Sequence, residues 1–160
     1  MVRPALALDA PVLVTLRELM FEAMGTPAAL LAGSRWRPAA LAWFEAASAD
    51  PDIRVVVAQI GGDVVSCGVG EVTRLIPGPS TPNGAVGLVS NIATVPAARG
   101  QGLASACLDA LLAWFDAETA VTRVDLFATP GGAVIYERRG FTEGTFPAMR
   151  RPSPVRRPPY

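Results

Sequence analysis

The chain has 160 residues, 51% of them hydrophobic and 18% charged, and its 14 basic residues, all arginine, balance 14 acidic ones. This size and composition predict one globular domain with a sizeable core, and the zero net charge gives no indication of a nucleic-acid or membrane partner. Histidine is absent, which excludes the usual base for a serine or cysteine nucleophile and the commonest metal ligand.

The two cysteines, Cys67 and Cys107, do not form a C-x-x-C motif, so no metal site is expected. We expect both to be reduced thiols that pack as small apolar residues in a cytoplasmic protein. No apolar run reaches the length of a membrane span, and Asp9 interrupts the segment that a signal peptide would keep apolar.

The N-terminal part predicts a short strand, at residues 2–5, and then two helices. Asp9 is placed to cap the first helix, Pro11 lies in its first turn, and apolar residues recur at helical spacing until Gly25. The second helix is predicted at residues 38–49.

A meander of three strands follows. The predicted strands are residues 53–60, 64–76 and 85–95. The sequence "GGD" at residues 61–63 predicts a hairpin turn, and the proline- and glycine-rich residues 77–84 predict a longer loop. Gly68 and Gly70 within the second strand indicate a bulge.

The C-terminal part predicts two helices and further strands. The elements are a long helix at residues 102–117, a strand at 123–128, a short helix at 131–140 and two short strands within 141–150. We expect residues 1–150 to form a single domain. Residues 151–160 predict an extended tail, rich in proline and arginine, in which Arg156 and Arg157 are solvated.

The sequence "VPAARGQGLAS" at residues 95–105 places two glycines just before the long helix. Glycine costs backbone entropy, so its use here indicates that bare backbone is needed. The first N–H groups of a helix lack intrahelical partners, and the helix dipole adds partial positive charge, so such a turn can bind a phosphate. The candidate groups are the amides of Gly100, Gln101, Gly102, Leu103 and Ala104, the charge of Arg99 and the hydroxyl of Ser105.

Two nucleotide-binding motifs fit this turn poorly. A Walker A loop requires lysine, which the chain lacks, and the dinucleotide fingerprint GxGxxG is broken because Ser105 stands at the third glycine position. Dinucleotide binding is therefore the weakest of the hypotheses.

The run from Arg99 to Ala104 resembles motif A of the GNAT acyltransferase superfamily, which is Arg or Gln, two residues, Gly, one residue, then Gly or Ala. The sequence "ATPGGAVIYERRGF" also resembles the family's strand end, short helix and Tyr-x-x-x-Gly-Phe ending, here with Tyr136 and Phe141. The order of the predicted elements agrees, so the resemblance extends over nearly the whole chain and is strongest between Asn91 and Phe141.

The resemblance implies an α/β (α+β type) GNAT fold, with a mixed, mostly antiparallel sheet of roughly six to seven strands, splayed in the middle and flanked by about four helices. It also implies acetyl-CoA as cosubstrate and no metal. The glycine turn would hold the pyrophosphate, and free backbone groups of Ile92, Ala93 and Thr94 would pair with the pantetheine arm like an added strand.

Family members transfer the acyl group directly to an amine in a ternary complex, so the missing histidine is no obstacle. The resemblance places Tyr136 as the general acid for the departing thiolate, and packing in an apolar helix face is the alternative. Some relatives carry a Glu on the third strand of the meander, where this chain has Leu88. Glu71 is the remaining candidate base, acting through water, and a solvated strand carboxylate is its alternative.

The acceptor is expected to be a small-molecule amine or an amino terminus. The resemblance offers Trp36, Trp43 and Phe44 as walls of its cleft, with Phe21 and Glu22 nearby, although ordinary packing explains them equally well. Ser90 and Asn91 are candidates to orient a water or the acceptor. An acyl-CoA-binding module without catalysis is the alternative function, and the resemblance leaves a homodimer open.

Overall fold

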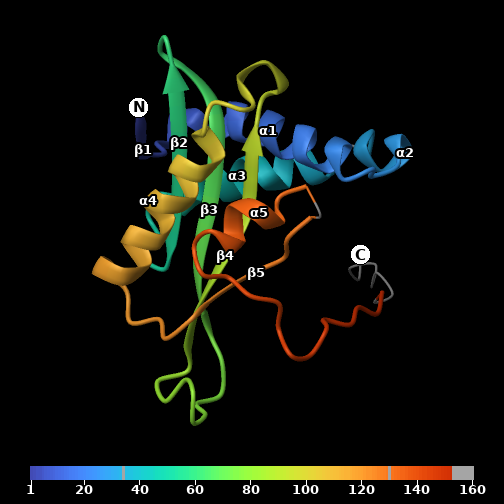
Figure 1. Ribbon diagram of the computed structural model, residues 1–160. Helices are drawn as coiled ribbons and strands as arrows, with labels where there is room; N and C mark the ends of the chain where they lie inside the picture. Colours follow the sequence, from blue (N-terminus) through green and yellow to red (C-terminus); the bar gives the residue numbers. More distant parts are fainter. Residues whose placement is uncertain (34, 130, 153–160) are drawn as a thin grey trace, which may run out of the picture.

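The computed structural model describes residues 1–33, 35–129 and 131–152 of the chain (Figure 1). Its centre is one sheet in which the strands follow in chain order. The strands are β1 (Val2–Pro4), β2 (Ile53–Ile60), β3 (Asp63–Arg74), β4 (Ala85–Thr94) and β5 (Val124–Leu126). Neighbouring strands are antiparallel except β4 and β5, which are parallel. The predicted mixed, mostly antiparallel sheet is therefore confirmed.

Within the described residues the sheet has five strands, fewer than the predicted six to seven. The difference lies in residues 141–150, for which two short strands were predicted and which form no strand in the structure. Gly144 and Pro147 disfavour extended pairing, and the apolar side chains of Phe146 and Met149 are 88% and 97% exposed, so this segment has no buried face to stabilise a strand. The tail from residue 153 onward, including Arg156 and Arg157, lies outside the described residues.

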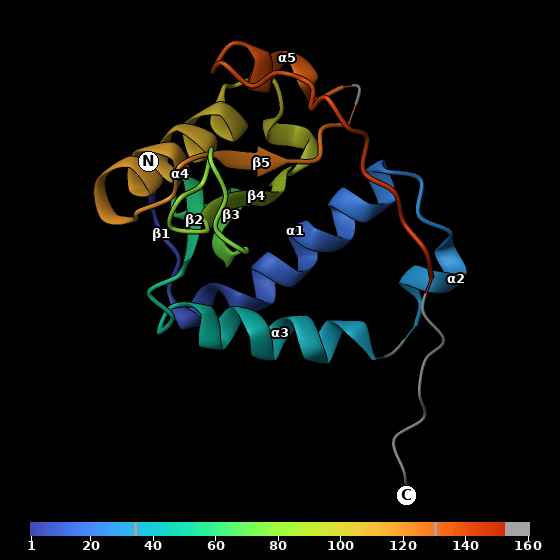
Figure 2. The same cartoon turned by 90° about the horizontal axis from the view of Figure 1, so that it is seen from below.

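Helices cover both faces of the sheet, which Figure 2 shows nearly edge-on. The helices are α1 (Ala10–Ala23), α2 (Ala28–Leu31), α3 (Trp36–Ala47), α4 (Leu103–Glu118) and α5 (Ala133–Glu137), with single 3-10 turns at Ala7–Asp9 and Pro96–Ala98. One core cluster joins α1 and α3 to the sheet, and another joins α4 to the opposite face. None of the helices in the described part of the chain has the length and apolarity needed to cross a membrane.

Local sequence explains most of these elements. Gly61 and Gly62 both adopt positive φ, 59° and 96°, and connect the paired residues Ile60 and Asp63 in the predicted hairpin turn. Helix α3 begins two residues before Pro38, which is tolerated because N–H groups in the first turn have no helical partner. Asp9 does precede α1, but its carboxylate accepts hydrogen bonds from the Leu6 N–H and from Arg3 instead of capping the helix.

Glycines of the sheet allow α4 to pack closely. A Cβ at residue 87 would lie 2.8 Å from Cε1 of Phe115, and one at residue 70 would lie 3.0 Å from the Trp114 ring. Gly68 is similarly confined by Ile92 and Leu111. The predicted bulge next to these glycines exists, but the extra residue is in β4, opposite Gly68.

Candidate functional site

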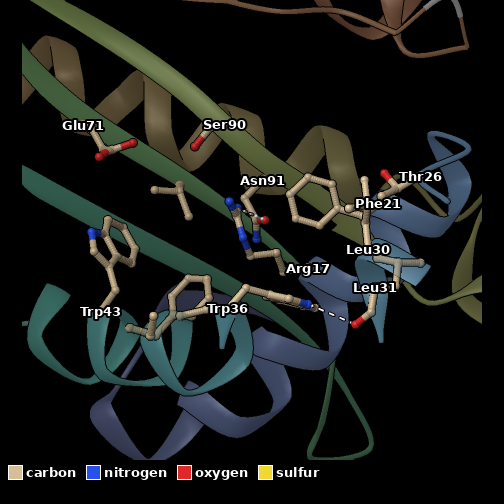
Figure 3. A pocket seen from close by; sticks show the side chains of 14 residues that line it. Arg17, Phe21, Thr26, Leu30, Leu31, Trp36, Trp43, Glu71, Ser90 and Asn91 are labelled. Atoms are coloured by element: carbon tan, nitrogen blue, oxygen red, sulfur yellow. Dashed lines mark hydrogen bonds between the residues drawn. The ribbon is translucent and has the colours of Figure 1, made fainter. Parts of the chain in front are cut away.

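A cavity of about 620 Å³ lies between the sheet and helices α1 to α3 (Figure 3). Its strand side carries polar groups from Glu71 of β3 and from Ser90 and Asn91 of β4, joined by Arg17 of α1. Its helix side is apolar, with the lining residues Phe21, Leu30, Leu31, Trp36, Trp43 and Phe44. The volume falls in the range of small-molecule sites, which also combine apolar walls with a few convergent polar groups.

The apolar wall is held in place by specific contacts. Trp36 donates from Nε1 to the carbonyl oxygen of Leu31 at 3.1 Å, which ties α3 to α2. The rings of Phe21 and Trp36 meet edge to face with centroids 6.1 Å apart. These contacts leave the aromatic faces fixed beside the cavity.

The polar side of the cavity carries two opposite charges. Burial raises the pKa of Glu71, and the nearby positive charge of Arg17 opposes this effect. Burial lowers the pKa of Arg17, while Glu71 acts in the other direction. The two groups influence one another without direct contact, because within the described chain no acidic oxygen lies within 4 Å of the Arg17 guanidinium.

A bulge in β4 aims two successive side chains into this cavity. Cys67 pairs with Ala93 but Val69 pairs with Ser90, so β4 has one extra residue at this point. Asn91 adopts a φ of 52°, a left-handed conformation that Asn tolerates better than most residues. Its Oδ1 accepts a hydrogen bond from Nη1 of Arg17 at 2.9 Å. The bulge therefore places both Ser90 and Asn91 on the cavity side.

Strands β4 and β5 cease to pair after Val89, just before the bulge. They pair only from Gly87 to Val89 on β4 and from Val124 to Leu126 on β5, whereas β4 continues to Thr94. At residues 90–94 the edge of β4 away from β3 therefore has no strand paired to it among the described residues, as the predicted splay requires, and we call this stretch the open edge of β4.

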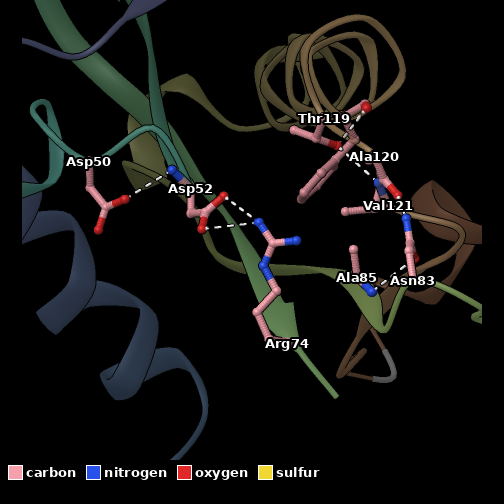
Figure 4. Close-up of polar contacts among 9 residues, drawn as sticks. Asp50, Asp52, Arg74, Asn83, Ala85, Thr119, Ala120 and Val121 are labelled. Atoms are coloured by element: carbon pink, nitrogen blue, oxygen red, sulfur yellow. Dashed lines mark hydrogen bonds and ion pairs between the residues drawn. The ribbon is translucent and has the colours of Figure 1, made fainter. Parts of the chain in front are cut away.

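The other end of this strand pair is closed by polar contacts (Figure 4). Asn83 donates from Nδ2 to the carbonyl oxygen of Ala120 at 2.7 Å, and its Oδ1 accepts from the Ala85 N–H at 3.0 Å. The Thr122 N–H donates to the Ala85 carbonyl oxygen at 3.1 Å. These contacts hold the start of β4 to the segment before β5, so the strands diverge in one direction only.

The alternating direction of the backbone N–H and C=O groups along β4 decides which of them lie on its open edge. The Val95 N–H donates to the Val65 carbonyl oxygen of the segment that forms β3. Because successive residues of a strand point their N–H and C=O groups to opposite edges, those of Ile92 and Thr94 point away from β3. The Ala93 carbonyl instead accepts a hydrogen bond from Ser66 Oγ at 2.9 Å. Of the three residues predicted to pair with the pantetheine arm, Ile92 and Thr94 are thus the two whose backbone groups lie on the open edge of β4.

The glycine turn lies at the end of β4. Gly100 and Gly102 have φ values of 77° and 78°, and a Cβ on either would meet no atom within 4 Å. The backbone conformation, rather than crowding, therefore requires glycine at both positions.

The backbone donors of this turn are free. Among the described residues, no intramolecular hydrogen bond uses the N–H groups of residues 100–105, and the first bond of α4 runs from the Ala106 N–H to the Gly102 oxygen at 2.9 Å. Arg99 is exposed and donates from Nε to the Thr94 carbonyl oxygen at 3.3 Å. Free amides and a positive charge thus meet at the N-terminus of the 16-residue helix α4.

Tyr136 lies on the other side of the sheet from the cavity. It packs half-buried against the cluster around α4, its ring centroid is 6.1 Å from that of Phe141, and burial raises its pKa. Helix α5 is fastened to α4 by the ion pair of Arg139 with Asp109, with Nη2 to Oδ2 at 2.7 Å. Tyr136 does not line the cavity that contains Glu71, and it belongs to the core cluster on the opposite face of the sheet.

Part of this cavity lining is predictable from the sequence. Phe21, Trp36, Trp43 and Phe44 line the cavity as proposed, but Glu22 does not. Both cysteines are free and buried, and burial raises the pKa of Cys67 to about 12, which agrees with the prediction of inert, reduced thiols.

Arg17 was missed. The available signal was its position four residues before Phe21 on one face of α1, where its guanidinium lies 4.8 Å from the ring centroid.

Comparisons with known proteins identify the family. Residues 51–143, more than half of the chain, match the family model described as the acetyltransferase (GNAT) domain. The chain therefore belongs to the GNAT acetyltransferase family, as the resemblance of its motifs predicted. A comparison with curated proteins finds no match.

Solved structures share the fold over nearly the full length. A GCN5-related N-acetyltransferase from Ralstonia eutropha JMP134 is 26% identical, with a TM-score of 0.84 over 96% of this chain and 97% of that chain. A predicted acetyltransferase with acetyl-CoA from Clostridium acetobutylicum is 19% identical, with a TM-score of 0.83 over 94% and 95%. Glucosamine-6-phosphate N-acetyltransferase from Arabidopsis thaliana is 16% identical, with a TM-score of 0.72 over 94% and 97%. These similarities confirm the predicted GNAT fold.

Proposed function

We propose that the protein is an N-acetyltransferase that moves an acetyl group from acetyl-CoA to a primary amine by direct transfer in a ternary complex. The observation that best supports this is the open edge of β4, which runs from a turn of free amides to a cavity containing Glu71. The family match, and the related structure with acetyl-CoA, support acetyl-CoA as the cosubstrate.

The free donors fit the chemistry of this cosubstrate. A pyrophosphate is an anion, and the amides of residues 100–105, the charge of Arg99 and the hydroxyl of Ser105 are the groups that would bind it. The pantetheine arm carries amides, which Ile92 and Thr94 can pair with as they would with a neighbouring strand. Acetyl-CoA supplies the activated thioester, and the remaining tasks belong to the protein.

Those tasks are proton transfers and charge stabilisation. Glu71 is the proposed base that takes a proton from the acceptor ammonium through a water molecule. The amine nitrogen then bonds to the carbonyl carbon while the carbon–sulfur bond breaks and leaves its electron pair on sulfur. The nitrogen releases its second proton to solvent as the amide forms. Tyr136 is the proposed acid for that thiolate, and its raised pKa keeps the phenol protonated at neutral pH. A backbone N–H on the open edge of β4 would polarise the carbonyl.

The test measures thiol release from acetyl-CoA with a panel of amines, for the wild type and for Tyr136→Phe. The phenylalanine variant keeps the ring contacts but has no proton to give, so we expect kcat to fall about ten- to a thousand-fold, near the range for general acids. Thermal unfolding of the variant controls for packing, because its melting temperature should be close to that of the wild type. An unchanged kcat would remove Tyr136 from the mechanism.

A second candidate is an acyl-CoA-binding module without catalysis. It is favoured by Leu88, which stands on β4 where some relatives carry a carboxylate. In that case acetyl-CoA at 100-fold its Kd should add about 2.7 kcal/mol to the free energy of unfolding, but no amine should release thiol. Thiol release with any amine decides against this candidate.

A further inference from the structure

Building on the proposed acetyl transfer, we propose that the acceptor is a free α-amino acid with a large apolar side chain. Its carboxylate would bind Arg17, its amino group would face Glu71, and its side chain would lie against the apolar wall of α1 to α3. The cavity divides into a polar strand side with the charges of Glu71 and Arg17 and an apolar helix side, as Figure 3 shows.

Arg17 has unused capacity to bind an anion. Within the described residues its side chain makes one hydrogen bond, from Nη1 to Asn91 Oδ1 at 2.9 Å, and no ion pair. A guanidinium has five N–H donors in a planar fork that matches a carboxylate, and a partly buried cation without an anion is costly. A carboxylate entering the cavity would therefore gain a charge-assisted pair on Arg17.

Glu71 carries the charge opposite to that of Arg17 in the same cavity. Its side chain has no hydrogen bond within the described chain, and burial disfavours its charged form. An ammonium group beside it would reverse this effect, because an opposite charge stabilises the carboxylate. One cation and one anion that do not neutralise each other by contact match an amino-acid zwitterion, in which the ammonium and the carboxylate are attached to the same carbon atom.

The rest of the lining selects the side chain of the acceptor. Trp36 is fixed by its bond to Leu31, Phe21 packs against it, and Trp43 stands 37% exposed. Contact between these aromatic surfaces and an apolar group is favourable, because it removes apolar area from water. A polyamine would need several anions, and Glu71 is the one acidic residue that the described part of the chain contributes to the lining. A sugar phosphate is disfavoured as the acceptor, because it would place polar groups against the aromatic wall.

The experiment compares acceptors that differ in one group. Acetyl transfer by the full chain is measured with L-phenylalanine, L-leucine, L-phenylalaninamide, phenethylamine and spermidine, and the products are identified by mass. We expect kcat/KM for L-phenylalanine to exceed that for phenethylamine, which lacks only the carboxylate, by about tenfold or more, the usual value of a charge-assisted hydrogen bond.

Variants of Arg17 separate binding from structure. Arg17→Met should lower kcat/KM for L-phenylalanine about 10- to 100-fold and that for phenethylamine much less, while Arg17→Lys should restore part of the loss. A purely structural role, through Asn91, would lower both acceptors equally. Arg74→Met is the matched control, because Arg74 pairs with Asp52 away from the cavity and should change neither value.

The outcomes distinguish this proposal from the one on which it rests. If phenethylamine or spermidine is acetylated as well as the apolar amino acids, or if Arg17→Met lowers both acceptors alike, the substrate class is wrong and acetyl transfer stands. If no amine in the panel releases thiol, the substrate class is wrong. In that case a failure of acetyl-CoA to raise the melting temperature would show that the proposed function is wrong too.

Discussion

The two faces of the central strands differ in how tightly they are packed. On one face, Gly68, Gly70 and Gly87 bring α4 so close that a Cβ at residue 87 would lie 2.8 Å from the Phe115 ring. On the other face, residues alternating with these glycines, such as Val69 and Glu71, look into a cavity of about 620 Å³. The same two strands thus serve as a rigid base on one side and as the floor of a site on the other.

This difference indicates that the two faces have different roles, one in stability and the other in the proposed reaction. A close-packed interior has low compressibility, so the contacts with α4 hold the backbone of β3 and β4 in place. Partly buried charged groups without an ion pair, such as Arg17 among the described residues, reduce stability, and they can be kept only where the remaining structure holds them in place. The dense α4 face therefore supports the open face, where the reaction is proposed to occur.

The largest effect on the free energy of unfolding is expected from truncating a large side chain on the densely packed face. Phe115 is 1% exposed, so Phe115→Ala should lower the free energy of unfolding by about 3–5 kcal/mol through lost burial and a residual void. Phe21→Ala is the control on the hollow face and should cost less than half as much, since one side of that ring already borders the cavity. Urea denaturation measures both. Equal losses would show that the two faces do not differ in packing.

An intermediate effect on the free energy of unfolding is expected from adding a side chain to the densely packed face. Gly87→Ala places a methyl group against Phe115 and should lower the free energy of unfolding by about 1–3 kcal/mol. Ala40→Leu adds a larger group on the cavity side and should change stability by less than about 0.5 kcal/mol, because space is available there. If Ala40→Leu destabilises the protein more than Gly87→Ala, the cavity is not open in solution.

The smallest effect concerns the pH dependence of stability. Since burial raises the pKa of Glu71 in the folded state, its carboxyl is neutral in both states below the ordinary glutamate value and becomes a buried charge as the pH rises through the raised pKa. Relative to Glu71→Gln, the wild type should therefore lose stability between acidic and neutral pH. Unfolding in urea at a series of pH values gives the difference.

Asp109 supplies a control of opposite sign. Its pKa is lowered by the hydrogen bond and charge of Arg139, so its contribution is present at neutral pH and is lost as the pH falls. The difference between wild type and Asp109→Asn should thus increase with pH, whereas that for Glu71→Gln decreases. Trends of the same sign for both variants would contradict the assignment of Glu71 to a desolvated position.

Much of the site depends on contacts that no local pattern encodes. Arg17 of α1 and Asn91 of β4 are 74 residues apart in sequence, and their hydrogen bond exists only because α1 packs across the sheet. The bulge at Asn91 also had no clear signal, because the glycines that suggested it lie on the neighbouring strand and serve the packing of α4. The two strands predicted in residues 141–150 were wrong because local extended character does not provide a partner.

By itself, the sequence determined the order of the helices and strands up to residue 140, except for the short helix α2, together with the hairpin at Gly61 and Gly62, the glycine turn before α4 and the family. These features depend on near neighbours along the chain, where backbone preference and hydrophobic period act directly. Only the tertiary structure decided where β4 and β5 part, which side of β4 is free, and that Arg17 and Glu71 share a cavity. Those features arise from packing between distant segments, whose free energy is distributed over many side chains and appears only when the fold is complete.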